Sequence, residues 1–301
     1  MSTSSAVVRT SAGPAGLATP AAAAPVRHWL RLFRSECRIV FLRPRNLAMF
    51  AVLAAAPVFL GIVLRINTPP PGAGGGPGAG AFIGQIADNG VFLSLFALFL
   101  LLTVMLPLAV AVVAGDSIAG EAGLGTLRTL LTVPAGRTRL LVTKYVMVLL
   151  FCFAACLLVA GVGLLMGALL FPIGPVTLLS GNSISLVAGL LRLVLIVGYV
   201  TAGLAALGAI GMALSTFTQH AIAVMAAILV IVMVSEILDA VAQVAAIHPY
   251  LPTNYWFSFD AFLRMPIGWP DVLHGLASFA VYTVIFGLIA WFRMNSADIT
   301  S

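Results

Sequence analysis

The sequence predicts an all-α polytopic membrane protein, with six transmembrane helices preceded by an amphipathic interfacial helix. Of its 301 residues, 61% are hydrophobic and only 8% are charged, whereas a soluble domain carries about 25% charged residues. The apolar residues come in long unbroken runs, not in the alternating segments of about 10 residues that are typical of a transmembrane β-barrel. The chain is long enough for six helices of about 20 residues each and their loops.

The amino-terminal region divides into a tail and a helix. Residues 1–25 predict a disordered cytosolic tail, because they are rich in small residues and proline and carry one charge, Arg9. The rest, 26–301, is predicted to form one six-span domain. Within it, 27–43 predicts the interfacial helix, with arginines on one side and aromatic and aliphatic residues on the other. Such a helix lies flat on an anionic leaflet, and a plain cytosolic lead-in is the alternative.

Six apolar runs predict the spans. They cover about 47–64, 91–114, 140–171, 187–214, 221–238 and 273–292. Pro107 predicts a kink in the second run. The third run would be roughly 48 Å long as one helix, so we expect it to project beyond the bilayer. Gly163 and Gly167, four residues apart in that run, would permit close helix packing.

The basic residues predict the orientation. Arg65, Arg192 and Arg264 fall on one side of the predicted spans, and the other twelve of the 15 basic residues fall on the opposite side. Because cytosolic loops carry the excess of Lys and Arg, both termini are predicted to be cytosolic in a multi-pass protein of the cell membrane. The long loop at 239–272 is then external. This topology explains the net charge of +6 without a nucleic-acid partner.

Motifs for several kinds of catalysis are missing from the sequence. A P-loop needs a lysine followed by Ser or Thr, and the single lysine, Lys144, is followed by Tyr145. There is no His-Glu-x-x-His pair for zinc, and the four histidines are scattered. Cys152 and Cys156 share a helix face within an apolar run, which favours packing. We therefore predict no catalytic, cofactor or metal site on this chain.

Two charged residues lie within the predicted spans near their outer ends. Arg192 and Glu236 are in neighbouring antiparallel spans and could lie at the same depth. An ion pair between them is one hypothesis, and independent snorkelling of each side chain to water is the other. Because intramembrane charges also mark ion pathways, an ion-coupled transporter stays open as an alternative function.

The most polar internal segment, 115–139, predicts a short amphipathic helix between the second and third spans. Its glycines permit turns, a threonine can cap the helix, three leucines share one face, and a proline ends it. The residues concerned are Glu121, Gly125, Thr126, Leu127, Leu130, Leu131, Pro134 and Arg137. The leucine face has no neighbour within its own segment, so it would rest on lipid or fit a groove on a partner.

This segment resembles the signature of the type-2 ATP-binding-cassette (ABC) exporter permeases. The matching residues are Gly120-Glu121, Gly125-Thr126-Leu127, Leu130-Leu131, Pro134, Arg137 and Lys144. The resemblance covers roughly 27–301, since that family also has an amphipathic helix before six spans and a re-entrant outer segment where 239–272 lies. One departure is 122–124, Ala-Gly-Leu, where the family usually carries charged residues.

The resemblance implies a function and partners. The 115–139 segment would be a coupling helix that docks into a cleft on a separate ATPase subunit. Glu121 would stabilise that interface, and Thr126, Leu127, Leu130 and Leu131 would lie in or beside the cleft. Two ABC ATPase subunits would bind ATP and Mg, and a second permease copy or a homologous permease would complete the pathway in the bilayer.

The cargo is expected to be hydrophobic or amphipathic, such as a drug, a lipid or a peptide antibiotic, because the spans offer few charges. Tyr255, Trp256 and Phe257 would shape the outer exit or anchor at the interface. The alternative is an ion-coupled secondary transporter without an ATPase. A membrane-bound enzyme is disfavoured, because the sequence shows no catalytic cluster.

Overall fold

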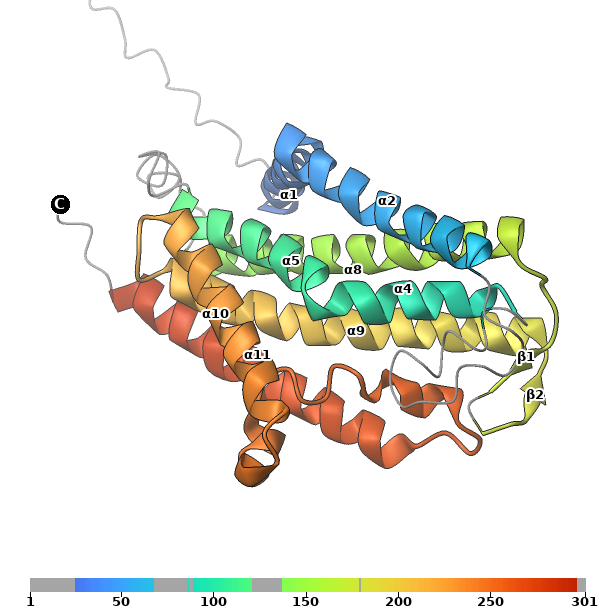
Figure 1. Ribbon diagram of the computed structural model, residues 1–301. Helices are drawn as coiled ribbons and strands as arrows, with labels where there is room; N and C mark the ends of the chain where they lie inside the picture. The colour runs from blue at the N-terminus through green and yellow to red at the C-terminus, as the bar shows by residue number, and fades with distance from the viewer. Residues whose placement is uncertain (1–24, 68–85, 87–88, 121–136, 179, 297–301) are drawn as a thin grey trace, which may run out of the picture.

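The computed structural model describes residues 25–67, 86, 89–120, 137–178 and 180–296, and it is almost entirely helical (Figure 1). The main helices are α1 (Pro25–Leu42), α2 (Pro44–Ile66), α4 (Val91–Thr103), α5 (Met105–Gly115), α8 (Arg137–Leu170), α9 (Leu186–Ser215), α10 (Ala221–Asp239) and α11 (Trp269–Ser296). The shorter elements are the π-helix η1 (Asp116–Gly120), the 3-10 helices η2 (Ala242–Val244), η3 (His248–Tyr250) and η4 (Ser258–Leu263), and the strands β1 (Val176–Thr177) and β2 (Ser183–Ile184).

The long helices support a multi-pass membrane protein. Five of them, α2, α8, α9, α10 and α11, are long and apolar enough to cross a bilayer. The pair α4 and α5 also qualifies when taken together, but the two helices are bent by 55°. The described chain therefore has five candidate spans, or six if the bent pair is one span. Each predicted apolar run falls largely within one of these helices or this pair.

Helix α9 lies at the centre of the bundle and packs against α5, α8, α10 and α11 (Figure 1). Of its most apolar window, 78% is buried, compared with 17% for α2 and for α11. Small residues permit this close packing. A Cβ added to Gly208 would lie 2.6 Å from Val148 of α8, and one added to Gly211 would lie 2.7 Å from Ala114 of α5.

The predicted kink at Pro107 is confirmed, and its position has a direct cause. A proline ring clashes with the carbonyl four residues earlier, which here belongs to Thr103, the last residue of α4. The break follows at Val104, whose φ and ψ are −140° and −49°. The two halves of this apolar run therefore point in different directions.

Helix α8 is one continuous helix of 34 residues, or about 51 Å at 1.5 Å per residue. This is longer than a hydrocarbon core of about 30 Å, as predicted from the sequence. The predicted close packing at Gly163 and Gly167 is also confirmed. A Cβ on Gly163 would lie 2.8 Å from Ser94, and one on Gly167 would lie 2.0 Å from the carbonyl oxygen of Gly90.

Short strands and non-helical chain cover the end of the bundle near β1 and β2. The two strands pair antiparallel, Val176 with Ile184, and Gly181 adopts a positive φ of 82° in the turn between them. Asn89 donates from Nδ2 to the carbonyls of Gly174 and Pro175, at 2.9 and 3.1 Å. In the chain that connects α10 to α11, η4 packs against α9 and α11.

The glycine seam between α4 and α8 generates a testable prediction. Replacing Gly167 with Ala should force α8 away from the start of α4, because the added Cβ overlaps the Gly90 carbonyl. Overpacking of this kind costs about 1–3 kcal/mol of stability. Gly161 is the matched control on the same helix, since its added Cβ meets nothing within 4 Å. Thermal unfolding in detergent should show Gly167→Ala melting below the wild type and Gly161→Ala unchanged or higher. Equal melting of the two variants would contradict the packing described here.

Candidate coupling site at the ends of the 121–136 segment

The structure describes the two ends of the predicted coupling segment and not its middle. Seven of the predicted residues lie outside the described ranges: Glu121, Gly125, Thr126, Leu127, Leu130, Leu131 and Pro134. The eighth, Arg137, is the first residue of α8. We therefore define two flanks, an upstream flank formed by Asp116–Gly120 and a downstream flank formed by 137–144.

The upstream flank is joined to the α1–α2 junction. Nη1 of Arg43 lies 3.0 Å from Oδ2 of Asp116, and Arg45 donates to the same oxygen. The two arginines flank Pro44, which is the first residue of α2. Proline is favoured at this position because its fixed φ suits the start of a helix. One carboxylate that accepts from two arginines connects the end of α5 to α1 and α2.

The downstream flank is joined to α1 by a buried ion pair. Nζ of Lys144 lies 3.6 Å from Oε2 of Glu36, and the two side chains are only 3% and 8% exposed. One turn further along α8, Sδ of Met147 lies 3.6 Å from Sγ of Cys37. Removing one partner of a buried pair leaves an uncompensated charge, which costs about 3–5 kcal/mol. The pair is therefore one of the contacts that hold α1 on α8.

The downstream flank is also joined to the carboxyl-terminal end of α11. Arg137 donates from Nη1 to the carbonyls of Met294 and Asn295, at 3.1 and 3.2 Å. These carbonyls belong to the last turn of a helix, where intrahelical partners are missing and a cation is favoured. Nε1 of Trp291 donates to Oγ1 of Thr138 at 2.9 Å. Arg293 also lies over the ring of Phe217, 5.3 Å from its centroid, which joins α11 to the turn between α9 and α10.

Together these contacts attach both flanks to helices that are distant in sequence. The α1–α2 junction contacts the upstream flank, and α1 and α11 contact the downstream flank. A displacement of the 121–136 segment would therefore act on α1, α2, α5, α8 and α11 at the same end of the bundle. Glu36 was missed by the sequence analysis, although it is the one acidic residue among the arginines of 27–43.

At the opposite end, the hypothesis of an ion pair between Arg192 and Glu236 is wrong. Nη1 of Arg192 donates instead to the carbonyls of Phe262 and Arg264, at 2.7 and 3.1 Å. Figure 1 shows the reason: α10 diverges from α9 beyond the turn that joins them, and the chain around η4 lies against α9. Backbone carbonyls as partners leave no signal in a sequence.

The predicted exit residues lie in the irregular chain between α10 and η4. Tyr255 accepts a hydrogen bond through its carbonyl from the hydroxyl of Tyr199, at 2.7 Å. The ring of Phe257 lies 4.8 Å from that of Phe99. Trp256 is 2% exposed and packs beside Gly203 of α9, so anchoring at the membrane interface is excluded for this residue. A gating role for the three residues stays a prediction.

The residues that the structure describes offer no obvious place for a bound metal. Among them, no three His, Cys, Asp or Glu side chains lie close enough together to hold an ion. The described site contains ion pairs and hydrogen bonds that connect separate helices.

The geometry defines a bundle with five or six candidate membrane spans, in which polar contacts join both flanks to helices that are distant in sequence. Residues 81–300 match a family described as "Protein of unknown function (DUF2705)", and the chain belongs to this family. The match covers α4 to α11 and leaves α1 and α2 outside. A comparison with curated proteins found no match.

The buried ion pair generates a prediction about stability. Replacing Glu36 with Gln leaves the Lys144 ammonium buried beside a neutral amide, so we expect a loss of about 3–5 kcal/mol. The double variant with Glu36→Gln and Lys144→Met removes both charges and should recover most of this loss. Chemical unfolding of the purified protein measures both. A double variant that is no more stable than Glu36→Gln alone would show that the pair contributes nothing specific.

Cys37 generates a prediction about pH. Burial, and secondarily the charge of Glu36, raise the pKa of the Cys37 thiol above its ordinary value. Less thiolate is therefore present at neutral pH than for an exposed cysteine, and only the thiolate reacts. Maleimide labelling of native protein should rise with pH at a midpoint above that of a small peptide thiol, whereas the fully buried Cys152 and Cys156 stay unlabelled. A midpoint at or below the peptide value would contradict this.

Proposed function

We propose that the chain is the membrane permease subunit of an ABC transporter. A separate ATPase subunit would act on it through the 121–136 segment. The observation that carries the proposal is the attachment of both flanks of this segment to other helices, through Asp116 on one side and Lys144 and Arg137 on the other. A segment that only connected two spans would need no such contacts.

The topology of the proposal has six spans, with the bent pair α4 and α5 counted as one. Helix α1 would lie along the cytosolic interface, with Arg34 and Arg38 exposed and Glu36 buried. Arg43, Arg45, Arg137 and Arg293 cluster at one end of the bundle through their contacts with Asp116, α11 and Phe217. The positive-inside rule makes this the cytosolic end, where both termini would lie in the cell membrane.

The proposed mechanism is a shift between two arrangements of the helices. ATP binding would bring two ATPase subunits together and displace the 121–136 segment, and the flanks would pass this displacement to α1, α2 and α11. A two-state equilibrium shifts only by the difference in affinity of the driving ligand for the two states. A second permease copy, or a homologous permease, would form the other wall of the path. The cargo would be hydrophobic or amphipathic, and export is the proposed direction.

The leucine face of the segment provides the test. Replacing both Leu127 and Leu131 with Asp should abolish binding of the ATPase subunit, while Thr129→Asp with Thr132→Asp, on the opposite face of the predicted helix, is the matched control. Burying a leucine contributes about 2 kcal/mol, so two losses should weaken binding by well over tenfold. The measurement is co-purification with an ATPase encoded beside this chain, together with cargo-stimulated ATP hydrolysis. Equal binding by the two double variants would overturn the proposal.

An ion-coupled transporter without an ATPase is the second candidate, because ionisable groups within spans mark ion pathways and Lys144 lies buried in the candidate span α8. Purified chain in vesicles distinguishes the two. Cargo movement driven by a proton or sodium gradient, with no ATPase present, would favour this candidate. Movement that requires both ATP and the partner subunit would favour the first.

A further inference from the structure

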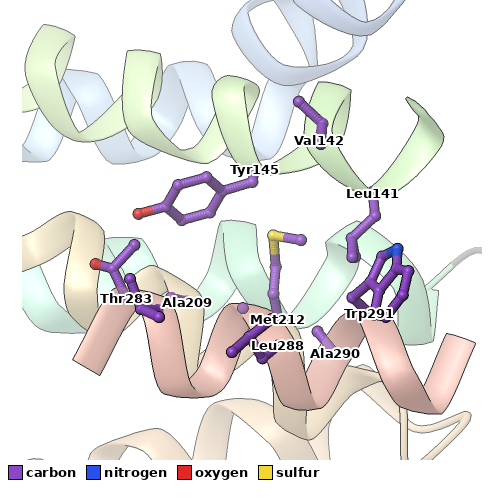
Figure 2. A pocket seen from close by; sticks show the side chains of 11 residues that line it. Leu141, Val142, Tyr145, Ala209, Met212, Thr283, Leu288, Ala290 and Trp291 are labelled. Atoms are coloured by element: carbon purple, nitrogen blue, oxygen red, sulfur yellow. The ribbon is translucent and has the colours of Figure 1, made fainter. Parts of the chain in front are cut away.

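A cleft of about 350 Å³ lies between α8, α9 and α11, near the end of the bundle that contains Arg137 (Figure 2). Its floor is formed by Ala209 and Met212 of α9, which are buried, and its rim includes Val142 and Leu288, which are 55% and 49% exposed. Figure 2 shows Met212 pointing into the space between α8 and α11. In a bilayer these exposed apolar rim residues would face hydrocarbon, and the cleft would open sideways into the membrane.

The inner surface of the cleft is almost entirely apolar. The Tyr145 hydroxyl donates to the carbonyl of Ala205 at 3.2 Å, and the indole N–H of Trp291 donates to Thr138. These two polar groups are therefore engaged with the protein, and a ligand would meet carbon surface apart from the hydroxyl of Thr283. The volume is within the range of about 300–1,000 Å³ that is usual for small-ligand sites.

The cleft also has the length of a lipid chain in one leaflet. Its lining on α11 extends from Thr283 to Trp291, or about 12 Å along the helix axis. One leaflet contributes about half of a hydrocarbon core that is about 30 Å thick. A single acyl chain that enters beside Trp291 and lies parallel to the helices would fill most of this length.

The end of the cleft beside Trp291 is basic. Arg137 and Arg139 lie one helical turn before the lining residues Leu141 and Val142, on the same faces of α8. The first turn of α8 has no acidic residue. An indole and two arginines at this depth match the headgroup region, where Trp and Arg are favoured and anionic lipids attract basic residues.

We propose that this cleft binds one acyl chain of an anionic phospholipid, with its phosphate beside Arg137 and Arg139. Lipid tails are as apolar as leucine, so burial alone does not favour the cleft over the bilayer. The close fit of the cleft around one acyl chain would favour binding. The contact of the phosphate with the two arginines would favour anionic lipids over neutral ones. The site goes beyond the proposed function and does not depend on an ATPase partner.

The test uses a photoreactive phosphatidylglycerol with a diazirine in its acyl chain, in phosphatidylcholine vesicles that contain the full chain. Labelled residues should map to 141–145 and 283–291. Gly287→Leu fills the cleft, since a Cβ there meets nothing within 4 Å, and labelling of these segments should be lost. Gly198→Leu, at an exposed position of α9 that is equally open and outside the cleft, is the matched control. Leu288→Trp, which covers the rim, serves as a second blocking variant.

A second comparison tests the headgroup. The same probe with a phosphatidylcholine headgroup should label the cleft about fivefold or more weakly, because each basic residue near the surface adds roughly a fivefold preference for anionic lipid. Arg139→Gln should reduce the preference for the anionic headgroup. Arg65→Gln, in the last turn of α2 and away from the cleft, should leave that preference unchanged. The proposal would be overturned by equal labelling of the wild type and Gly287→Leu, or by equal labelling with the two headgroups.

Discussion

The contact between Glu36 and Lys144, 3.6 Å apart and almost fully buried, is the interaction on which the proposed coupling site depends most. It joins α1 to α8 at Lys144, the last residue of the downstream flank. Two opposite charges that are buried together stabilise the fold only while both are present, because removing one leaves the other uncompensated. The pair therefore contributes to the position of α1 on the bundle, together with the contact of Cys37 with Met147 and the stacking of Phe41 on Phe50 of α2.

Around this pair, the end of the bundle near the 121–136 segment differs physically from the opposite end. At the first end, side chains from different helices meet as charged or hydrogen-bonded partners: Arg43 and Arg45 with Asp116, and Trp291 with Thr138. At the other end, Arg192 and Tyr199 bind backbone carbonyls, and the ion pairs His248–Asp239 and Arg264–Asp260 involve only α10 and the chain that connects α10 to α11.

Several features of the fold could be predicted because their causes are local. Pro107 has no N–H and collides with the Thr103 carbonyl in any helix, so the break follows from the residue itself. Gly163 and Gly167 have no Cβ, and four-residue spacing places them on one face, against Ser94 and Gly90. The apolar runs predicted helices of about the observed lengths, since a backbone in hydrocarbon must satisfy its own hydrogen bonds.

The sequence by itself determined the class, the apolar helices, the bend and the small-residue contact, because each depends on residues close together in the chain. Only the tertiary structure decided which charges meet. Glu36 and Lys144 are 108 positions apart, and their pairing depends on how α1 crosses α8. Arg192 lies near backbone carbonyls in place of Glu236, because α10 diverges from α9. Partners of this kind are set by the angles between helices, which follow from packing over whole helix faces and not from any local pattern.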